Sequence, residues 1–441
     1  MTEASRTADE SPDGIGRETI RRVSWRLLPF LMLAYLVCYI DRTNAGFAAL
    51  QMNKAVGISA AAFGLGGGIF FLSYCLFEVP SNLALERFGA RRWIARIMVS
   101  WGIVSGCMAL TAGPRSFVLI RFLLGAAEAG FFPGVILYMT YWFPAEQRAR
   151  LVGIFMVAIP VSGVVGSPVS AALLGLDGRL GLAGWQWLFI LEAAPAVLLG
   201  GLALLWLTDR PQDAAWLSPA QRAWLVGRME QERALAKPVA HAPALTVIRN
   251  RYVLAMALVY AGGATASSGL GLWQPQFLKS FGVSTLTVGW LNALPYALSA
   301  VAMVWWGRRS DRAAERFRHT LLPLALSGAA LVLLIPFPAL LPSMVLLCVS
   351  VVATSVTRGP FWALATEWLA SRSAAAGIGM INGIGTGFGF VCNALMGATK
   401  EATGSYPLAF LPIVGFVAIG CGVLLAIGRP QRLAVAVSPL P

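Results

Sequence analysis

The sequence has little charge and almost no histidine. Of its 441 residues, 12% are Asp, Glu, Lys or Arg, two are His and 57% are hydrophobic. A soluble domain carries about twice that charged fraction. The scarcity of charge therefore excludes an ordinary soluble protein and predicts an all-α membrane protein that crosses the bilayer several times. The two histidines, His241 and His319, lie far apart in polar segments, so no histidine cluster supports a metalloenzyme.

Other catalytic and metal-binding patterns are missing as well. The cysteines all fall inside apolar runs without metal-ligand spacing, and we expect them to be small buried hydrophobes. They are Cys38, Cys75, Cys107, Cys348, Cys392 and Cys421. The glycines at 64, 66, 67 and 68 lie inside an apolar run, which favours close helix contact over a phosphate-binding loop. We therefore expect no enzyme activity, no metal, no cofactor and no nucleotide-driven pump.

The formal net charge is +14, which by itself would suit a nucleic-acid-binding protein. The arginines, however, cluster in short segments between the apolar runs, as the positive-inside rule describes for cytoplasmic loops. This distribution predicts no nucleic-acid partner and places both termini in the cytoplasm. The first apolar run is too long for a cleavable signal peptide.

Twelve apolar runs have the length of a membrane-spanning helix. A polar stretch separates the first six from the last six, so we expect a tail (1–24), a first half (25–208), a cytoplasmic linker (209–250), a second half (251–428) and a tail (429–441). Within the linker, residues 219–235 are predicted to form a helix on the membrane surface. The predicted spans are 25–45, 60–85, 93–112, 117–141, 151–174, 187–207, 252–281, 288–306, 320–340, 342–368, 375–398 and 406–427.

An acidic residue followed by an arginine recurs at equivalent places in the two halves. Glu86-Arg87 follows the second span, and Asp311-Arg312 follows the eighth. Positive-inside charge explains the arginines but neither the acids nor the repeat. We predict that these pairs cap neighbouring helices and join the two halves, which would hold one conformational state shut.

Several segments together resemble the major facilitator superfamily, and within it the anion:cation symporter family of organic-acid transporters. The resemblance covers about residues 25–427. The segments that carry it are Tyr39-Ile-Asp41-Arg42-Thr-Asn44, Phe77-Glu-Val-Pro-Ser-Asn82, Arg121-Phe-Leu-Leu-Gly125-Ala-Ala-Glu128-Ala-Gly130, Tyr141-Trp-Phe-Pro144, Trp187-Leu-Phe-Ile-Leu-Glu192, Asp209-Arg-Pro211, Gly307-Arg-Arg-Ser-Asp311-Arg312, Gly359-Pro-Phe-Trp362 and Ile381-Asn382-Gly383.

The resemblance implies twelve helices in two pseudo-symmetric six-helix bundles that rock about a central site, which is alternating access. It implies a multi-pass protein of a bacterial inner membrane, and we expect a monomer. Several members of the family couple carboxylate uptake to protons or sodium. We expect H⁺ as the coupling ion, with Na⁺ as the alternative.

Asp41 and Arg42 are the most informative pair in the chain. They lie roughly 16 residues into the first span, about 24 Å along a helix that needs about 30 Å to cross the hydrocarbon core. Charged groups at that depth are costly unless they pair or face water, which favours a functional role. The alternative is that the two residues neutralise each other or mark the membrane edge.

Arg121 and Glu128 are seven residues apart on the fourth span, so they share one helix face. Their depth is similar to that of Asp41 and Arg42, and we predict that the four groups converge. An arginine fork matches a carboxylate, and by resemblance Arg42 is the first candidate for the substrate carboxylate and Arg121 the second. Asp41 and Glu128 are the candidates for carrying the proton. A static salt-bridge cluster is the alternative.

Other candidate binding residues lie in spans 1, 2 and 10. Tyr39 and Tyr74 match positions that line the site in relatives, although packing explains many membrane tyrosines. Arg358 lies near the middle of span 10, where it should face a cavity and grip a second polar group, unless it pairs with the carbonyls freed near Pro360. Trp362 lies one turn further on and would stack on a substrate ring.

Asparagines in span 11 could add polar contacts. Asn393 is a candidate binding residue and Asn382 a second one, with interhelical hydrogen bonds as the alternative for both. Glu78, Glu192 and Glu367 are predicted to lie near cytoplasmic span ends and to be structural.

The sequence thus predicts a secondary transporter that imports an organic anion with protons. A drug–proton antiporter and a non-transporting membrane sensor are the alternatives. The substrate class stays open among dicarboxylates, sugar acids and aromatic acids.

Overall fold

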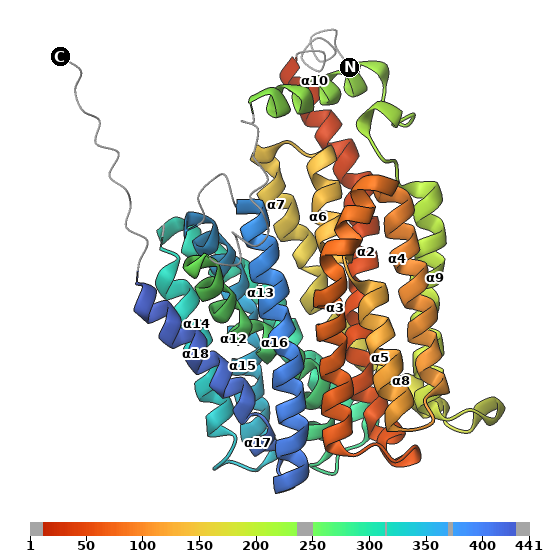
Figure 1. The fold of residues 1–441 in the computed structure, drawn as a ribbon, viewed down its shortest axis with the longest axis vertical. Coiled ribbons are helices and arrows are strands. Elements are labelled where there is room, and N and C mark those ends of the chain that lie inside the picture. The colour runs from red at the N-terminus through yellow and green to blue at the C-terminus, as the bar shows by residue number, and fades with distance from the viewer. Residues whose placement is uncertain (1–11, 236–249, 314, 369–373, 429–441) are drawn as a thin grey trace, which may run out of the picture.

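The computed structural model describes residues 12–235, 250–313, 315–368 and 374–428, and these residues form helices and loops without a strand. Figure 1 shows two groups of helices side by side, coloured red to yellow-green for the N-terminal half and green to blue for the C-terminal half. The helix α10 (Pro219–Leu235) lies across one end of the molecule. We call this end the linker face and the opposite end the far face.

The predicted all-helical membrane fold is confirmed. Within the described residues, eleven helical stretches are long and apolar enough to cross a membrane, and the shorter apolar helix α14 occupies the place of the predicted ninth span. The N-terminal half contains α2 (Pro12–Ala55), α3 (Ala60–Phe88), α4 (Ala90–Cys107), α5 (Pro114–Glu128), α6 (Phe131–Trp142), α7 (Ala145–Met156), α8 (Ala158–Leu173) and α9 (Gly184–Trp206). The C-terminal half contains α12 (Arg251–Lys279), α13 (Thr285–Ala313), α14 (Phe317–Leu333), α15 (Leu340–Trp368), α16 (Ala374–Thr403), α17 (Tyr406–Ala409) and α18 (Leu411–Ile427).

The first helix begins earlier than the sequence predicted. Residues 12–24, which were expected to belong to a polar tail, continue α2 beyond the apolar run. Val23 of this extension and Leu225 of α10 are fully buried in one hydrophobic cluster. Packing against α10 therefore stabilises as helix a segment that polarity alone assigned to a tail. The rest of that tail (1–11), part of the linker (236–249) and the C-terminal tail (429–441) lie outside the described residues.

The linker helix has the predicted bounds but docks on protein. Arg228 of α10 forms an ion pair with Glu146 at 2.5 Å. Glu232 pairs with Arg148 at 2.9 Å and accepts the backbone N–H of Ala145 at 3.0 Å, so it caps the start of α7. These contacts tie α10 to the N-terminal half.

The fourth span is broken in the middle. Gly130 adopts a left-handed conformation (φ 86°), which ends α5 at Glu128 and starts α6 at Phe131. A side chain at this position would also collide with Ser81 of α3. Glycine is thus needed both for the backbone conformation and for the close approach of α3. The break places Glu128 at a helix end within the bundle.

The two halves close against each other near the far face. Phe63 of α3 meets Trp273 of α12 edge to face, with ring centroids 5.2 Å apart, and both side chains are buried. Beside them the backbones of α3 and α16 touch at Gly64 and Gly397, where an added Cβ would collide with the facing helix. Glycines allow this close approach, as expected for helix packing inside a membrane.

Two hydrogen bonds also cross between the halves toward the far face. Glu401 of α16 accepts the backbone N–H of Ala61 at 2.7 Å, at the start of α3. Asn292 of α13 donates to the hydroxyl of Ser167 in α8 at 2.8 Å. The aromatic contact, the glycine contact and these two bonds form one layer, which we call the far-face layer.

Candidate functional site

A cavity lies between the two halves and is lined by residues from both. α2, α3, α6, α7 and α8 contribute from the N-terminal half, and α12, α13, α15 and α16 from the C-terminal half. Its charged lining residues are Arg42 and Arg358, one from each half, and no Asp or Glu is found among the described residues that line it. The charged side chains that reach the cavity are therefore both basic, which suits a negatively charged occupant.

Arg42 projects from α2 into an aromatic cage. Its guanidinium lies 5.1 Å from the ring centre of Tyr39 and 4.9 Å from that of Tyr74, and all three residues line the cavity. The structure thus brings these three predicted residues together. The Nη2 of Arg42 has no hydrogen-bond partner among the described residues. A donor left unpaired at the edge of a cavity can bind an acceptor on a ligand.

Glu128 lies directly behind Arg42. The two side chains form an ion pair, and the Cys38 thiol donates to the same carboxylate oxygen at 3.1 Å. Glu128 is fully buried, and its second oxygen lacks a partner among the described residues. Arg42 is its ion-pair partner, so any ligand that draws Arg42 away leaves a buried carboxylate with the full cost of its desolvation.

Asp41 does not join this group in the structure. It is fully buried and turns toward α4, where it accepts hydrogen bonds from the Trp101 indole and the Ser105 hydroxyl, both at 2.9 Å. Asn44 donates to it at 3.4 Å. The four predicted charges lie close enough to interact, since Arg121 feels the charges of Asp41, Arg42 and Glu128. Asp41 and Arg42 project from α2 in different directions, however, so Asp41 has hydrogen-bond partners of its own.

Arg121 is also enclosed within the N-terminal half rather than at the cavity. It is 1% exposed, it donates weakly to the carbonyl of Gly66 at 3.4 Å, and its guanidinium lies 4.8 Å from the ring centre of Phe70. Its Nη1 has no partner among the described residues. Of the four predicted charges of the N-terminal half, Arg42 is the one that lines the cavity.

The C-terminal half presents Arg358 and Trp362 on one face of α15, as their spacing predicted. Arg358 donates to the hydroxyl of Ser267 at 2.7 Å, and both arginine and tryptophan line the cavity. The Tyr260 ring lies 5.1 Å from the Trp362 ring. Tyr260 and Ser267 of α12 were missed by sequence reasoning. The sequence feature that could have identified them is the presence of polar residues among the glycines of span 7.

A chain of hydrogen bonds links the N-terminal half to this aromatic wall. Asn382 of α16 donates to Glu78 of α3 at 3.0 Å and accepts from the Tyr260 hydroxyl at 3.1 Å. Asn382 and Tyr260 line the cavity, whereas Glu78 is 5% exposed. Glu78 therefore holds a cavity-facing asparagine from across the interface. Sequence reasoning treated it as a structural residue because span position alone does not reveal the facing helix.

The structure also shows where two other predicted residues, Asn393 and Glu192, lie. Asn393 is buried in α16, donates to the carbonyl of Gly389 at 2.8 Å and to Ser268 at 3.4 Å, and is not among the cavity-lining residues, so the alternative of an interhelical role fits it better. Glu192 accepts from Ser170 at 2.6 Å. It lies in the first half of α9, nearer the far face than the linker face, and its predicted place at a cytoplasmic span end stays a prediction.

The acid–arginine repeats do not join the halves in this conformation. Asp311 pairs with Arg316 at 2.6 Å inside the C-terminal half, and Arg312 is exposed. Glu86 and Arg87 are exposed and make no ion pair with the other half within the described residues.

Acidic residues other than those of the repeats cap the neighbouring helices. Asp209 caps the start of α4 by accepting the backbone N–H of Arg91 at 2.8 Å. Glu315 caps α14 by accepting the backbone N–H of Arg318 at 2.8 Å. The gating role of the repeats stays a prediction.

Comparison with known proteins decides the family. Residues 31–392 match the family described as Major Facilitator Superfamily. The chain belongs to this superfamily. A major facilitator protein is a secondary transporter that crosses the membrane many times and moves a small molecule, and it is not an enzyme.

Two relatives and one solved structure illustrate what this chain is similar to. The chain is 45% identical over 416 residues to a protein of Agrobacterium vitis named "Putative tartrate transporter", covering 94% of this chain and 92% of that one. It is 41% identical over 403 residues to a "Quinolone resistance transporter" of Acinetobacter baumannii, covering 90% and 92%. The structure titled "Inward open conformation of the xylose transporter XylE from E. coli" has a TM-score of 0.72 at 12% identity, covering 92% of this chain and 96% of that chain, and so shares the fold.

Proposed function

We propose that this major facilitator protein imports a small organic anion with two carboxylates, together with protons. The observation that carries the proposal is the cavity itself, which is lined by Arg42 from one half and Arg358 from the other and by no acidic residue within the described chain. An arginine binds a carboxylate through two parallel hydrogen bonds. Two arginines from opposite halves suit a solute that carries a carboxylate at each end.

The relatives support the same substrate class. Among them is the protein whose name mentions tartrate, at 45% identity over nearly the whole chain. Tartrate is a dicarboxylate with two hydroxyls, and the cavity also offers neutral polar groups on Ser267 and Asn382. Tyr39, Tyr74 and Tyr260 add hydroxyls that donate to anions.

The Arg42–Glu128 ion pair supports proton coupling. When a substrate carboxylate occupies the Arg42 guanidinium, Glu128 shares or loses its countercharge while it stays buried. A buried carboxylate without a countercharge takes up a proton. Proton binding at Glu128 and substrate binding at Arg42 are thereby linked, and each favours the other. The proton is the coupling ion in this scheme, and the protein works as a monomer.

Alternating access completes the proposal. The far-face layer joins the two halves on one side of the cavity, which supports the linker face as the side that opens. The arginine-rich loops lie at the linker face, which supports a cytoplasmic location for that face by the positive-inside rule. The protein would then reside in a bacterial plasma membrane with both termini inside the cell.

A drug–proton antiporter is the second candidate, and the relative named for quinolone resistance favours it. The two functions differ in direction and in the charge that the cavity must bind. An exporter of cations would not need Arg42 at the cavity.

The experiment is uptake of radiolabelled tartrate into proteoliposomes with and without an imposed inward pH gradient. We expect accumulation above equilibrium only with the gradient, and competition by other small dicarboxylates but not by organic cations. A thermal-shift series of organic acids on purified protein identifies ligands independently of transport, because a ligand that binds the native state stabilises it. Accumulation that ignores the pH gradient would remove proton coupling, and competition by cations alone would favour the exporter.

A further inference from the structure

One face of helix α13 changes from apolar to strongly basic along its length. Three exposed apolar residues are followed by three exposed arginines at spacings of three and four residues, which puts them all on one helix face. In chain order they are Val301, Val304, Trp305, Arg308, Arg309 and Arg312. They line a groove outside the transport cavity, and we call this the α13 groove.

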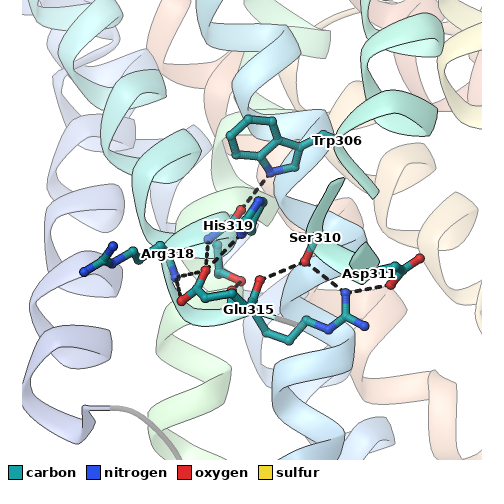
Figure 2. Close-up of polar contacts among 8 residues, drawn as sticks. Trp306, Ser310, Asp311, Glu315, Arg318 and His319 are labelled. Carbon is teal, nitrogen blue, oxygen red and sulfur yellow. Dashed lines mark hydrogen bonds and ion pairs between the residues drawn. The ribbon is translucent and has the colours of Figure 1, made fainter. Parts of the chain in front are cut away.

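The acidic residues next to the groove, Asp311 near the end of α13 and Glu315 between α13 and α14, already have partners (Figure 2). Asp311 pairs with Arg316 at 2.6 Å, and Arg316 also donates to Ser310 at 2.9 Å. Glu315 accepts the backbone N–H of Arg318 at 2.8 Å and contacts the His319 ring at 2.9 Å. Both carboxylates therefore have partners other than the arginines of the α13 groove.

Glu315 stays ionised in this arrangement. Burial raises the pKa of its carboxyl, but hydrogen bonds from the backbone of Arg318 and from His319 outweigh burial, and the pKa lies below its ordinary value. Its charge is therefore present at neutral pH, where it caps α14 and orients His319.

The three arginines of the α13 groove keep their charge without a carboxylate partner. Within the described residues, none of Arg308, Arg309 and Arg312 takes part in an ion pair. The guanidinium of Arg309 lies 5.9 Å from the centre of the Trp305 ring, which is itself 59% exposed. Both the charges and the indole are thus available to a ligand.

Adjacent arginines also occur in the N-terminal half, as Arg91 and Arg92 at the start of α4, but the surroundings differ. There the Trp93 ring is stacked on Phe88 and lies 3.9 Å from the guanidinium of Arg96. Its indole N–H also donates to Ser81 at 3.0 Å. Trp93 therefore already has contacts within the protein on its ring and on its indole N–H.

We propose that the α13 groove binds an acidic phospholipid, with the phosphodiester on the arginines and an acyl chain along Val301, Val304 and Trp305. The helix crosses the membrane, so its exposed apolar part lies at the depth of acyl chains. The tryptophan lies between the apolar and the basic parts, which is where interfacial aromatic residues sit. Charge, depth and shape therefore all complement an anionic lipid, and neither a soluble anion nor a zwitterionic lipid matches all three.

The test measures lipid binding to the purified full-length protein by native mass spectrometry. The probes are dioleoylphosphatidylglycerol, dioleoylphosphatidylcholine and inorganic phosphate. The test variant is R308Q/R309Q, and the control is R91Q/R92Q, which also removes two adjacent arginine charges, from the start of α4.

We expect phosphatidylglycerol to bind wild-type protein more tightly than the other two probes. Each arginine near a membrane surface contributes about a fivefold change in affinity for acidic lipid, so R308Q/R309Q should weaken the tightest binding roughly 25-fold. R91Q/R92Q should change the affinity of this tightest binding by no more than about twofold. The single variant R312Q should lose about fivefold, and single variants carry the test if the double variant does not fold.

Equal losses in R308Q/R309Q and R91Q/R92Q would overturn the proposal, because they would show diffuse attraction to a basic surface. Equal binding of phosphatidylcholine would overturn the role of charge. Equal binding of inorganic phosphate would overturn the role of the apolar part of the groove.

Discussion

The two halves of the molecule differ in where they place charge. The N-terminal half buries Asp41, Arg121, Glu128 and Glu192 at 5% exposure or less, inside its own bundle. In the C-terminal half, the charged residue at the cavity is Arg358, and neutral hydroxyls and amides surround it. Burying ionisable groups is costly, so we expect those of the N-terminal half to have a functional role.

The difference indicates a division of labour. Under the proposed function, the N-terminal half would exchange a countercharge between Glu128 and the ligand through Arg42. The C-terminal half would hold the other end of the ligand against a wall of Arg358, Tyr260 and Trp362. The following predictions would break or sharpen this contrast, beginning with the largest effect.

Arg42→Ala should nearly abolish uptake, because it removes the guanidinium that binds the ligand and leaves Glu128 buried without a countercharge. A charge-assisted hydrogen bond contributes about 1.5–3 kcal/mol, so a loss of about 100-fold in the rate at low substrate concentration is expected. Initial uptake rates in proteoliposomes measure it. Arg42→Lys is the control for charge without the planar fork and should recover only part of the activity. Full activity of Arg42→Ala would remove the N-terminal half from substrate binding.

Glu128→Gln should uncouple transport from protons. The variant cannot bind and release the proton, so accumulation driven by a pH gradient should be lost while exchange of labelled for unlabelled substrate continues. Both are measured in the same proteoliposomes. Asp41→Asn should have the smaller effect, since Asp41 bonds to Trp101 and Ser105 rather than to Arg42. The reverse order of effects would move proton carriage to Asp41.

Arg358→Gln should impair transport of dicarboxylates more than transport of monocarboxylates. Removing the second arginine should raise the KM for a dicarboxylate by about 10-fold or more, which corresponds to one charged hydrogen bond. A monocarboxylate that uses Arg42 alone should be affected within about twofold. Competition curves with paired mono- and dicarboxylates measure the difference. Equal effects on both classes would show that Arg358 only supports the fold.

Glu78→Ala should weaken binding moderately, by about fivefold, because it releases Asn382 and through it Tyr260. Glu78→Gln keeps an acceptor for Asn382 and should be nearly normal. The KM at several pH values separates the roles: a positioning residue changes the KM equally at each pH, whereas a proton carrier would also change the pH profile. A large defect in Glu78→Gln would show that the N-terminal half has a second proton carrier.

Glu401→Ala should give the smallest effect, a shift toward opening of the far face. Its carboxylate caps the start of α3 from the other half, and a negative charge at a helix N-terminus is stabilising. A cysteine placed at the cavity residue Thr43 should then react about two- to fivefold faster with a membrane-impermeant reagent.

The matched control for Glu401→Ala is Lys400→Ala at the neighbouring position. Lys400 contacts the carbonyl of Gly404 and the ring of Tyr406, so these contacts stay inside the C-terminal half. Its removal should leave the labelling rate unchanged. Equal rates in the two variants would show that the Glu401 cap does not hold the far-face layer closed.

Much of the fold was predictable, because spans are encoded locally. Apolar length, the basic loops and the polar linker identified the helices and their division into halves. The bounds of α10 agreed with the prediction, but its docking partners did not follow from its own sequence. The extension of α2 to Pro12 likewise depended on the burial of Val23 against α10, which is a contact distant in sequence.

The candidate site was predictable in part. Arg42, Tyr39, Tyr74, Arg358 and Trp362 all reach the cavity. The two arginines stand out in the sequence because the bilayer makes charge at mid-membrane depth costly.

What the sequence determined by itself is therefore depth: which groups lie inside the membrane and at what level along each helix. Only the tertiary structure decided direction, since it turned Arg42 toward the cavity and Asp41 toward Trp101, and brought Glu78 to Asn382 of the other half. The physical reason is that hydrophobicity acts on each segment separately, whereas hydrogen-bond partners are supplied by whichever helices pack against it.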